Sequence, residues 1–303
     1  MTVSPRLIRA MPWIFVLIWS TGFIVARYGM PQSPPMSFLT IRYGLSISCF
    51  LVWIAVSGAA WPRGRAQWGH LALTGMMMHG GYLGGVWAAV KAGIGAGTVA
   101  LLVGLQPVLT AVWVSRRAAV ALTTGAGPGT DRPLVAAIGR VQWLGLALGF
   151  GGLLLVVWRK LGVGELNAWN LSLALMALVS ITVGTLYQKH HVEPCDVRTA
   201  STVQLVGALL VSLPFVAFES EPIHANAYFF GAMAWSVLGL TLGGSSLLYL
   251  LIQRGAATQV TSLLFLVPPC TALMAWPLFG ETLAPLALAG MALTAIGVAL
   301  VVR

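Results

Sequence analysis

A histidine with a tyrosine three residues later is the first combination in this chain that could do chemistry. The stretch TGMMMHGGYLGG, Thr74 to Gly85, contains His79 and Tyr82, and side chains at that spacing project from the same face of a helix. An imidazole in apolar surroundings is costly to keep charged and needs a hydrogen-bond partner even when neutral. His79 is therefore expected to bond a neighbouring helix, to contact a bound small molecule, or to carry a proton.

Arg42 is a second candidate, because it lies within the apolar run 37–57. A charge deep in a membrane span costs roughly 2.5–3.5 kcal/mol on insertion scales, and less near an end from which the side chain can reach water. Two interpretations follow. Arg42 snorkels or bonds a neighbouring carbonyl, or it faces a cavity in which it attracts the carboxylate of a substrate.

Hydroxyls, amides and aromatic rings near the middle of other apolar runs complete the candidate substrate site. They are Trp19, Ser20, Gln106, Thr182, Gln204, Ser245 and Tyr249. A hydroxyl in a helix commonly returns a hydrogen bond to its own backbone, so Ser20 and Thr182 either do that or line a cavity. Trp19 packs or anchors like other tryptophans, or supplies a flat apolar wall.

Two prolines are candidate hinges. Pro107 and Pro268 interrupt apolar runs, and each removes a backbone donor and bends its helix. The bends are either static kinks or the points at which the protein changes conformation.

Catalytic and metal chemistry have little support. The three cysteines show no C-x-x-C spacing, so neither a zinc site nor a disulfide framework is predicted. No strand precedes the glycine-rich stretches, which excludes a phosphate loop and favours close helix packing. No cofactor and no metal are expected. One enzymatic alternative remains, an intramembrane serine hydrolase with Ser245 or Ser246 as nucleophile and His79 as base, although no carboxylate is available to orient the histidine.

The composition predicts the elements that hold these residues. The chain has 303 residues, of which 58% are hydrophobic and 8% charged, with a mean hydropathy of +0.88. Soluble chains carry roughly 25% charged residues, and a membrane helix needs about 20 apolar residues. We therefore predict an all-α polytopic membrane protein with ten transmembrane helices. The expected spans are 11–29, 37–57, 68–90, 97–115, 138–158, 168–188, 199–218, 227–252, 258–280 and 283–302.

The basic residues orient these spans. Arg42 apart, twelve fall on the side of the termini and four on the other side. This bias is typical of cytoplasmic loops, so both termini are predicted to be cytoplasmic, and the scattered charge does not indicate a nucleic-acid partner. The longest connection, 116–137, is polar and basic and is expected to be a flexible cytoplasmic loop.

The two halves of the chain resemble each other. When they are aligned so that Gly22 falls on Gly184, Arg42 falls on Gln204 and His79 falls on the region around Thr241. Five spans per half mean that the second half enters the membrane in the opposite direction, which is the mark of inverted-repeat secondary transporters. The predicted organisation is 1–137 for spans 1–4 and the basic loop, 138–166 for span 5, and 167–303 for spans 6–10.

The chain resembles the ten-helix EamA-type members of the drug/metabolite transporter superfamily. The resemblance rests on WSTGFIVAR (19–27), IRYGLS (41–46), the paired LQPVLTAV (105–112) and LVPPCTAL (266–273), and LFGETL (278–283). Family halves often end their fourth span with Gly-Glu; Gly280-Glu281 does so, whereas the first half has Ser115-Arg116-Arg117, which puts strict symmetry in doubt. The resemblance is nearest to bacterial exporters of aromatic and other bulky amino acids. It implies a bacterial inner-membrane exporter in which spans 1–4 and 6–9 line a central cavity and spans 5 and 10 are peripheral.

The acidic residues bear on how transport is driven. All seven lie outside the middle of the spans, whereas a proton-coupled exporter of cations usually carries an intramembrane carboxylate. A neutral or zwitterionic small molecule moved by uniport is therefore favoured, with a proton-coupled drug or metabolite antiporter as the alternative. The expected partners are this small molecule and membrane lipid, and the oligomeric state stays open.

Overall fold

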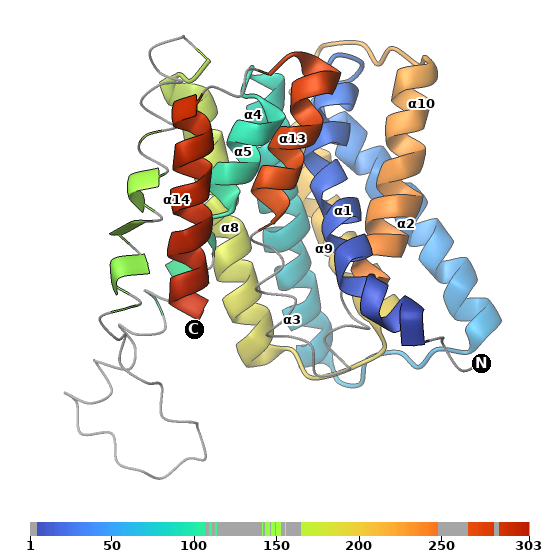
Figure 1. The fold of residues 1–303 in the computed structure, drawn as a ribbon. Coiled ribbons are helices and arrows are strands. Elements are labelled where there is room, and N and C mark those ends of the chain that lie inside the picture. The colour runs from blue at the N-terminus through green and yellow to red at the C-terminus, as the bar shows by residue number, and fades with distance from the viewer. Residues whose placement is uncertain are drawn as a thin grey trace.

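All regular structure in the described part of the chain is helical. The computed structural model describes residues 5–106, 109, 110, 113, 165–247, 266–281 and 285–302, together with 141, 143–145, 147, 148, 150–152 and 155. Its helices are α1 (Pro5–Gly29), α2 (Pro35–Ser57), α3 (Arg65–Gly75), η1 (Met76–Gly81), α4 (Tyr82–Lys91), α5 (Ala96–Val103), α8 (Ala168–His191), α9 (Val197–Val216), α10 (Ala227–Ala234), η2 (Trp235–Gly244), α13 (Val267–Phe279) and α14 (Pro285–Val302). They stand side by side as one bundle (Figure 1).

The described helices fall where the hydrophobic runs predict them. Within the described residues, four stretches are long and apolar enough to cross a membrane, namely α2, α8, α9 and Ala227–Leu247, and shorter apolar helices include Trp13–Gly29 and Val267–Phe279. The helices α3, η1 and α4 follow one another without a break and match the span predicted at 68–90. Most of the span predicted at 138–158 and the loop at 116–137 lie outside the described residues. The fold is that of a polytopic α-helical membrane protein.

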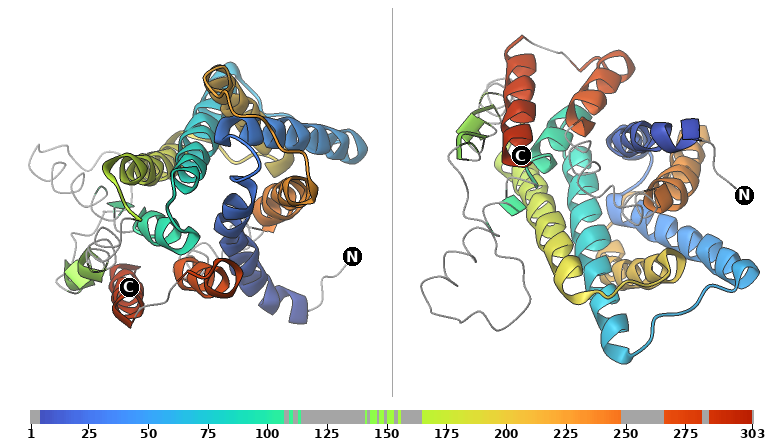
Figure 2. Two further views of the ribbon diagram at one scale, coloured as in Figure 1. Left: turned by 90° about the horizontal axis from the view of Figure 1, so that it is seen from above. Right: turned by 60° about the horizontal axis from the view of Figure 1, so that its bottom comes forward.

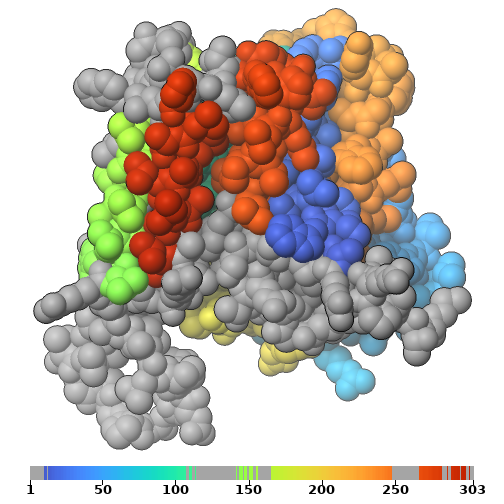
Figure 3. All heavy atoms as spheres, viewed as in Figure 1, coloured from blue at the N-terminus to red at the C-terminus, as the bar shows by residue number. Residues whose placement is uncertain are grey.

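The outer face of the bundle is apolar, as lipid contact requires. Large apolar side chains that are more than half exposed include Trp13, Leu17, Leu273, Trp276 and Ile296. They lie on α1, α13 and α14, which stand next to one another on the face in Figure 3. In a soluble protein such a surface would aggregate, whereas hydrocarbon chains cover it at no cost. The interior packs aromatic side chains, among them the fully buried Phe15, Phe38, Tyr43 and Phe50.

Corresponding helices of the two halves run in opposite directions. In Figure 1, α1 rises and α8 descends, and α2 descends while α9 rises. The packing has the same correspondence, since α2 contacts η2 and α9 contacts η1. In Figure 1, α1 begins and α14 ends at the lower end of the bundle. Seen from above, α14 lies at the edge of the arrangement (Figure 2). These directions agree with the predicted inverted repeats, but the repeats and the peripheral last span stay predictions.

Each half also contains a π-helical segment at the corresponding place. The segments η1 and η2 overlap when the two halves are aligned with His79 on Thr241. A π-helix is a wider turn that frees backbone groups from the regular ladder and often marks a functional site. The hydrophobic periodicity of the sequence does not distinguish such segments from an α-helix, so our predictions do not include them.

Glycines let α9 approach α3 and η1 closely. A Cβ on Gly75 would overlap the carbonyl oxygen of Gln204, and one on Gly207 would overlap that of Ala72. Neither oxygen belongs to a flexible side chain, so no side chain fits at these positions. Gly81 also allows a close helix contact, as predicted for the glycine-rich stretch. A Cβ at this position would lie only 2.6 Å from the hydroxyl of Ser180 on α8.

Carboxylates from distant segments cap two helices at the upper end of the bundle. Glu281 accepts hydrogen bonds from the backbone N–H groups of Ala96 (2.7 Å) and Gly97 (3.2 Å), and Glu165 accepts from that of Gly95 (3.0 Å). Glu219 caps α2 in the same manner. Each cap satisfies donors that a helix cannot satisfy itself and places negative charge at the positive end of the helix dipole.

The lower end of α9 carries its own cap. The Asp196 carboxylate accepts from the backbone N–H of Arg198 (2.9 Å) and from its guanidinium. The hydrogen bond from the Arg198 side chain holds the pKa of Asp196 below its usual value. The stabilisation is therefore present at neutral pH and is lost as the pH falls through that lowered pKa.

Candidate functional site

Two adjoining cavities lie inside the bundle. The first, of about 80 Å³, is surrounded by α1, α2, η1, α4, α8 and η2; its lining is Trp19, Gly22, Phe23, Arg42, Met78, His79, Tyr82, Leu83, Val86, Trp87, Ile181, Leu240, Thr241 and Ser245. The second, of about 70 Å³, lies beside α5 and α13; its lining is Trp19, Phe23, Tyr82, Ala100, Val103, Gly104, Gln106, Ile181, Val267 and Pro268. At roughly 10–15 Å³ per water, each holds on the order of five or more waters.

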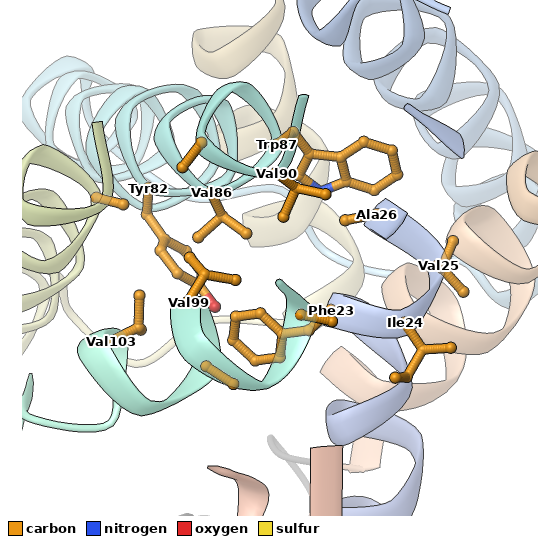
Figure 4. Packing of buried hydrophobic residues seen from close by; sticks show 14 of the residues in the cluster. Phe23, Ile24, Val25, Ala26, Tyr82, Val86, Trp87, Val90, Val99 and Val103 are labelled. Carbon is orange, nitrogen blue, oxygen red and sulfur yellow. The ribbon is translucent and has the colours of Figure 1, made fainter. Parts of the chain in front are cut away.

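Aromatic side chains form the wall that the two cavities share. Trp19, Phe23 and Tyr82 line both. Figure 4 shows Tyr82 reaching from α4 to α5, where Val99 and Val103 lie, with its hydroxyl end towards Phe23. Such a wall offers flat apolar contact to a bound molecule and leaves few positions for polar recognition.

Arg42 is the strongest charge in the first cavity. It is 6% exposed, so it does not snorkel. Its Nε and Nη2 donate to the hydroxyl oxygen of Thr241 at 3.3 and 3.1 Å, and that hydroxyl donates to the carbonyl of Ser236 at 2.9 Å. Among the residues that the structure describes, no carboxylate forms an ion pair with Arg42. A buried guanidinium without a counter-ion is costly, which makes this cavity attractive to an anionic group.

His79 both contacts a neighbouring helix and lines the cavity. The Gln204 side chain on α9 lies near its imidazole. Its backbone carbonyl accepts a hydrogen bond of 2.7 Å from the hydroxyl of Tyr43, whose ring lies 6.4 Å from the imidazole. His79 therefore lines a cavity, and its contact with a bound small molecule stays a prediction.

The other predicted site residues divide into two groups. Trp19, Tyr82 and Ser245 line the first cavity, and Gln106 lines the second while donating to Thr185 at 3.0 Å. The hydroxyls of Ser20 and Thr182 instead bond carbonyls of their own helices, at 2.7 Å each. Neither these two residues nor Gln204 line either of the two cavities. Tyr249 lies outside the described residues.

The two predicted hinges also differ. Pro268 lies in the first turn of α13 and lines the second cavity, against Gly104. Pro107 lies outside the described residues, but the helical ladder of α5 ends before it, at Val103. Movement at these two prolines stays a prediction.

Several lining residues are missing from the prediction, above all Phe23, Trp87, Ile181 and Thr241. The first three are ordinary apolar residues with no distinguishing pattern. Thr241 could have been found, because the alignment of the two halves that sets Arg42 on Gln204 also sets His79 on Thr241.

The described helices form a polytopic α-helical membrane protein with largely apolar internal cavities, an architecture that membrane transport proteins share. Residues 168–303 match the EamA-like transporter family. This match covers a little less than half of the chain, and together with the relatives described next it supports an EamA-type transporter of the inner membrane.

Its relatives extend over most of the chain. The uncharacterized inner membrane transporter YedA of Escherichia coli is 22% identical, over 88% of this chain and 81% of its own. The uncharacterized transporter sll0355 of Synechocystis is 22% identical, over 94% and 86%. A probable amino-acid metabolite efflux pump of Salmonella typhimurium is 23% identical, over 94% and 91%. One solved crystal structure shares the fold, with a TM-score of 0.64 and 14% identity over 98% of each chain.

Proposed function

We propose that this transporter exports amino acids, aromatic or other bulky neutral ones, by alternating access around the central cavities. In this proposal ten helices form two inverted five-helix repeats with both termini in the cytoplasm. The observation that carries it is the first cavity, in which residues from both halves of the chain enclose an aromatic space with a buried guanidinium. Substrate sites of inverted-repeat transporters lie at such an interface.

The character of the cavity supports this class of substrate. Trp19, Phe23 and Trp87 provide contact area for an aromatic or branched side chain, while Arg42 and His79 provide polar contacts for an amino-acid backbone. The name of the Salmonella relative, a probable amino-acid metabolite efflux pump, points in the same direction.

The described lining also supports uniport. Neither cavity is lined by an aspartate or glutamate in the part of the chain that the structure describes. His79 is then the residue through which a proton could be coupled, and this keeps the antiporter as the alternative that an experiment must separate.

The test is export measured in proteoliposomes with a panel of labelled amino acids, with and without a pH gradient, against protein-free liposomes. We expect flux of aromatic and branched amino acids that does not depend on the gradient. Flux only with the gradient would support the antiporter. Flux of no amino acid would end the proposal.

The serine hydrolase alternative can be tested separately. Ser245 lines the same cavity as His79, but no hydrogen bond among the described residues joins the imidazole to Ser245 or Ser246. A serine-reactive probe is expected to leave both serines unlabelled, and stoichiometric labelling of either would revive the hydrolase.

His79→Ala is expected to reduce flux several-fold while the protein stays folded. The substitution removes the imidazole from the cavity wall and from its Gln204 partner, but it retains the backbone carbonyl that Tyr43 bonds. Flux in proteoliposomes and the elution profile in detergent are the measurements. Normal flux through the variant would return His79 to a packing role.

A further inference from the structure

Two pairs of polar residues beside the first cavity are counterparts of each other. Arg42 on α2 bonds Thr241 on η2, and Gln204 on α9, which does not itself line the cavity, lies near His79 on η1. A single alignment of the two halves places Arg42 on Gln204 and His79 on Thr241. Each pair thus joins the second helix of one half to the π-helical segment of the other.

The two corresponding residues Arg42 and Gln204 differ in charge. We propose that the two pairs form two unlike ends of one binding site, so that the transporter selects substrates by a carboxylate bound at Arg42, with Thr241 as the positioning residue for the guanidinium. His79, with Gln204 beside it as a positioning residue, binds the neutral polar group of the substrate. This inference rests on the proposed function and names the feature of the substrate that the site requires.

Thr241 is suited to holding a guanidinium without neutralising it. Its hydroxyl hydrogen is directed to the carbonyl of Ser236, so its oxygen is left to accept from Nε and Nη2 of Arg42. A carboxylate at position 241 would neutralise the charge of the Arg42 guanidinium. Among the described residues Nη1 has no hydrogen-bond partner, and an arginine bonds a carboxylate through parallel donors.

The opposite end makes a weaker demand on the substrate. A neutral imidazole has one donor and one acceptor nitrogen, so His79 can bond an amino group or a hydroxyl. Neither His79 nor Gln204 bears the fixed negative charge that would make an ammonium group obligatory. The site should therefore take apolar carboxylates as a class, with the amino group contributing but not required.

The test is the binding of matched compounds to the purified protein in detergent, by titration calorimetry. Phenylalanine, phenyllactate and phenylpropionate carry the carboxylate, whereas phenethylamine carries only the amine. We expect the three acids to bind within about tenfold of one another, and phenethylamine to bind at least about a hundredfold more weakly. Phenethylamine binding as well as phenylalanine, or the wild type binding none of the acids, would overturn the proposal.

Variants test the positioning role. Thr241→Val should raise the Kd of all three acids about tenfold without changing that of phenethylamine, and Thr241→Ser should restore it. Thr202→Val is the matched control, because the Thr202 hydroxyl is also buried but bonds the carbonyl of its own helix residue Arg198. An equal loss for acids and amine in Thr241→Val would indicate a merely structural threonine.

The neutral end has its own variant. Gln204→Leu should weaken phenylalanine and phenyllactate but leave phenylpropionate unchanged, and equal weakening of all three would contradict the assignment. Binding needs no flux, so intact selectivity with no transport in proteoliposomes would end the export proposal alone.

Discussion

Arg42→Gln is expected to abolish flux of amino acids while the protein folds and inserts normally. The guanidinium is 6% exposed and bonds only a neutral hydroxyl among the described residues. Removing it relieves the cost of a buried charge, so the unfolding temperature should stay the same or rise. A bond from a charged donor is worth roughly 1.5–3 kcal/mol, so substrate affinity should fall about ten- to a hundredfold.

Glutamine is an informative replacement because it occupies the corresponding position, residue 204, of the second half. Arg42→Lys is the control that retains the charge and loses the planar fork, and it should retain part of the flux. Flux in proteoliposomes and thermal unfolding in detergent are measured side by side. Full flux in Arg42→Gln, or a large loss of thermal stability, would assign Arg42 to structure instead of binding.

Glu281→Ala is expected to lower stability clearly more than the loss of an exposed carboxylate at the same end of the bundle. It would leave the backbone N–H groups of Ala96 and Gly97 without their acceptor, and it would remove negative charge from the N-terminus of α5. Losing these charge-assisted bonds should cost about 1.5–3 kcal/mol. Because α5 supplies Ala100 and Val103 to the second cavity, ligand binding should weaken as well.

Glu221→Ala is the matched control. Glu221 pairs with Lys91 at the same end of the bundle, but its side chain is 61% exposed, and exposed ion pairs contribute about 0–1 kcal/mol. Thermal unfolding of both variants in detergent is the measurement. Equal unfolding temperatures for Glu281→Ala and the wild type would show that Glu165 alone suffices to cap α5.

The sequence by itself determined the class of protein and most of its helices. A long hydrophobic run in lipid must form a helix, because only then are its backbone N–H and C=O groups hydrogen-bonded. The helices α2 and α9 accordingly lie within about two residues of their predicted bounds. It also singled out His79 and Arg42, because a polar group in an apolar run is conspicuous wherever the run folds.

Only the tertiary structure decided what those residues contact. Arg42 and Thr241 are 199 positions apart, and no local pattern encodes which hydroxyl a guanidinium will meet. The same limit applies to Ser20 and Thr182, whose sequence positions suit a cavity but whose hydroxyls turn back to their own helices. Helix formation is a local property fixed by composition and length, whereas a binding site depends on the rotation of each helix about its axis and on its neighbours, which packing alone sets.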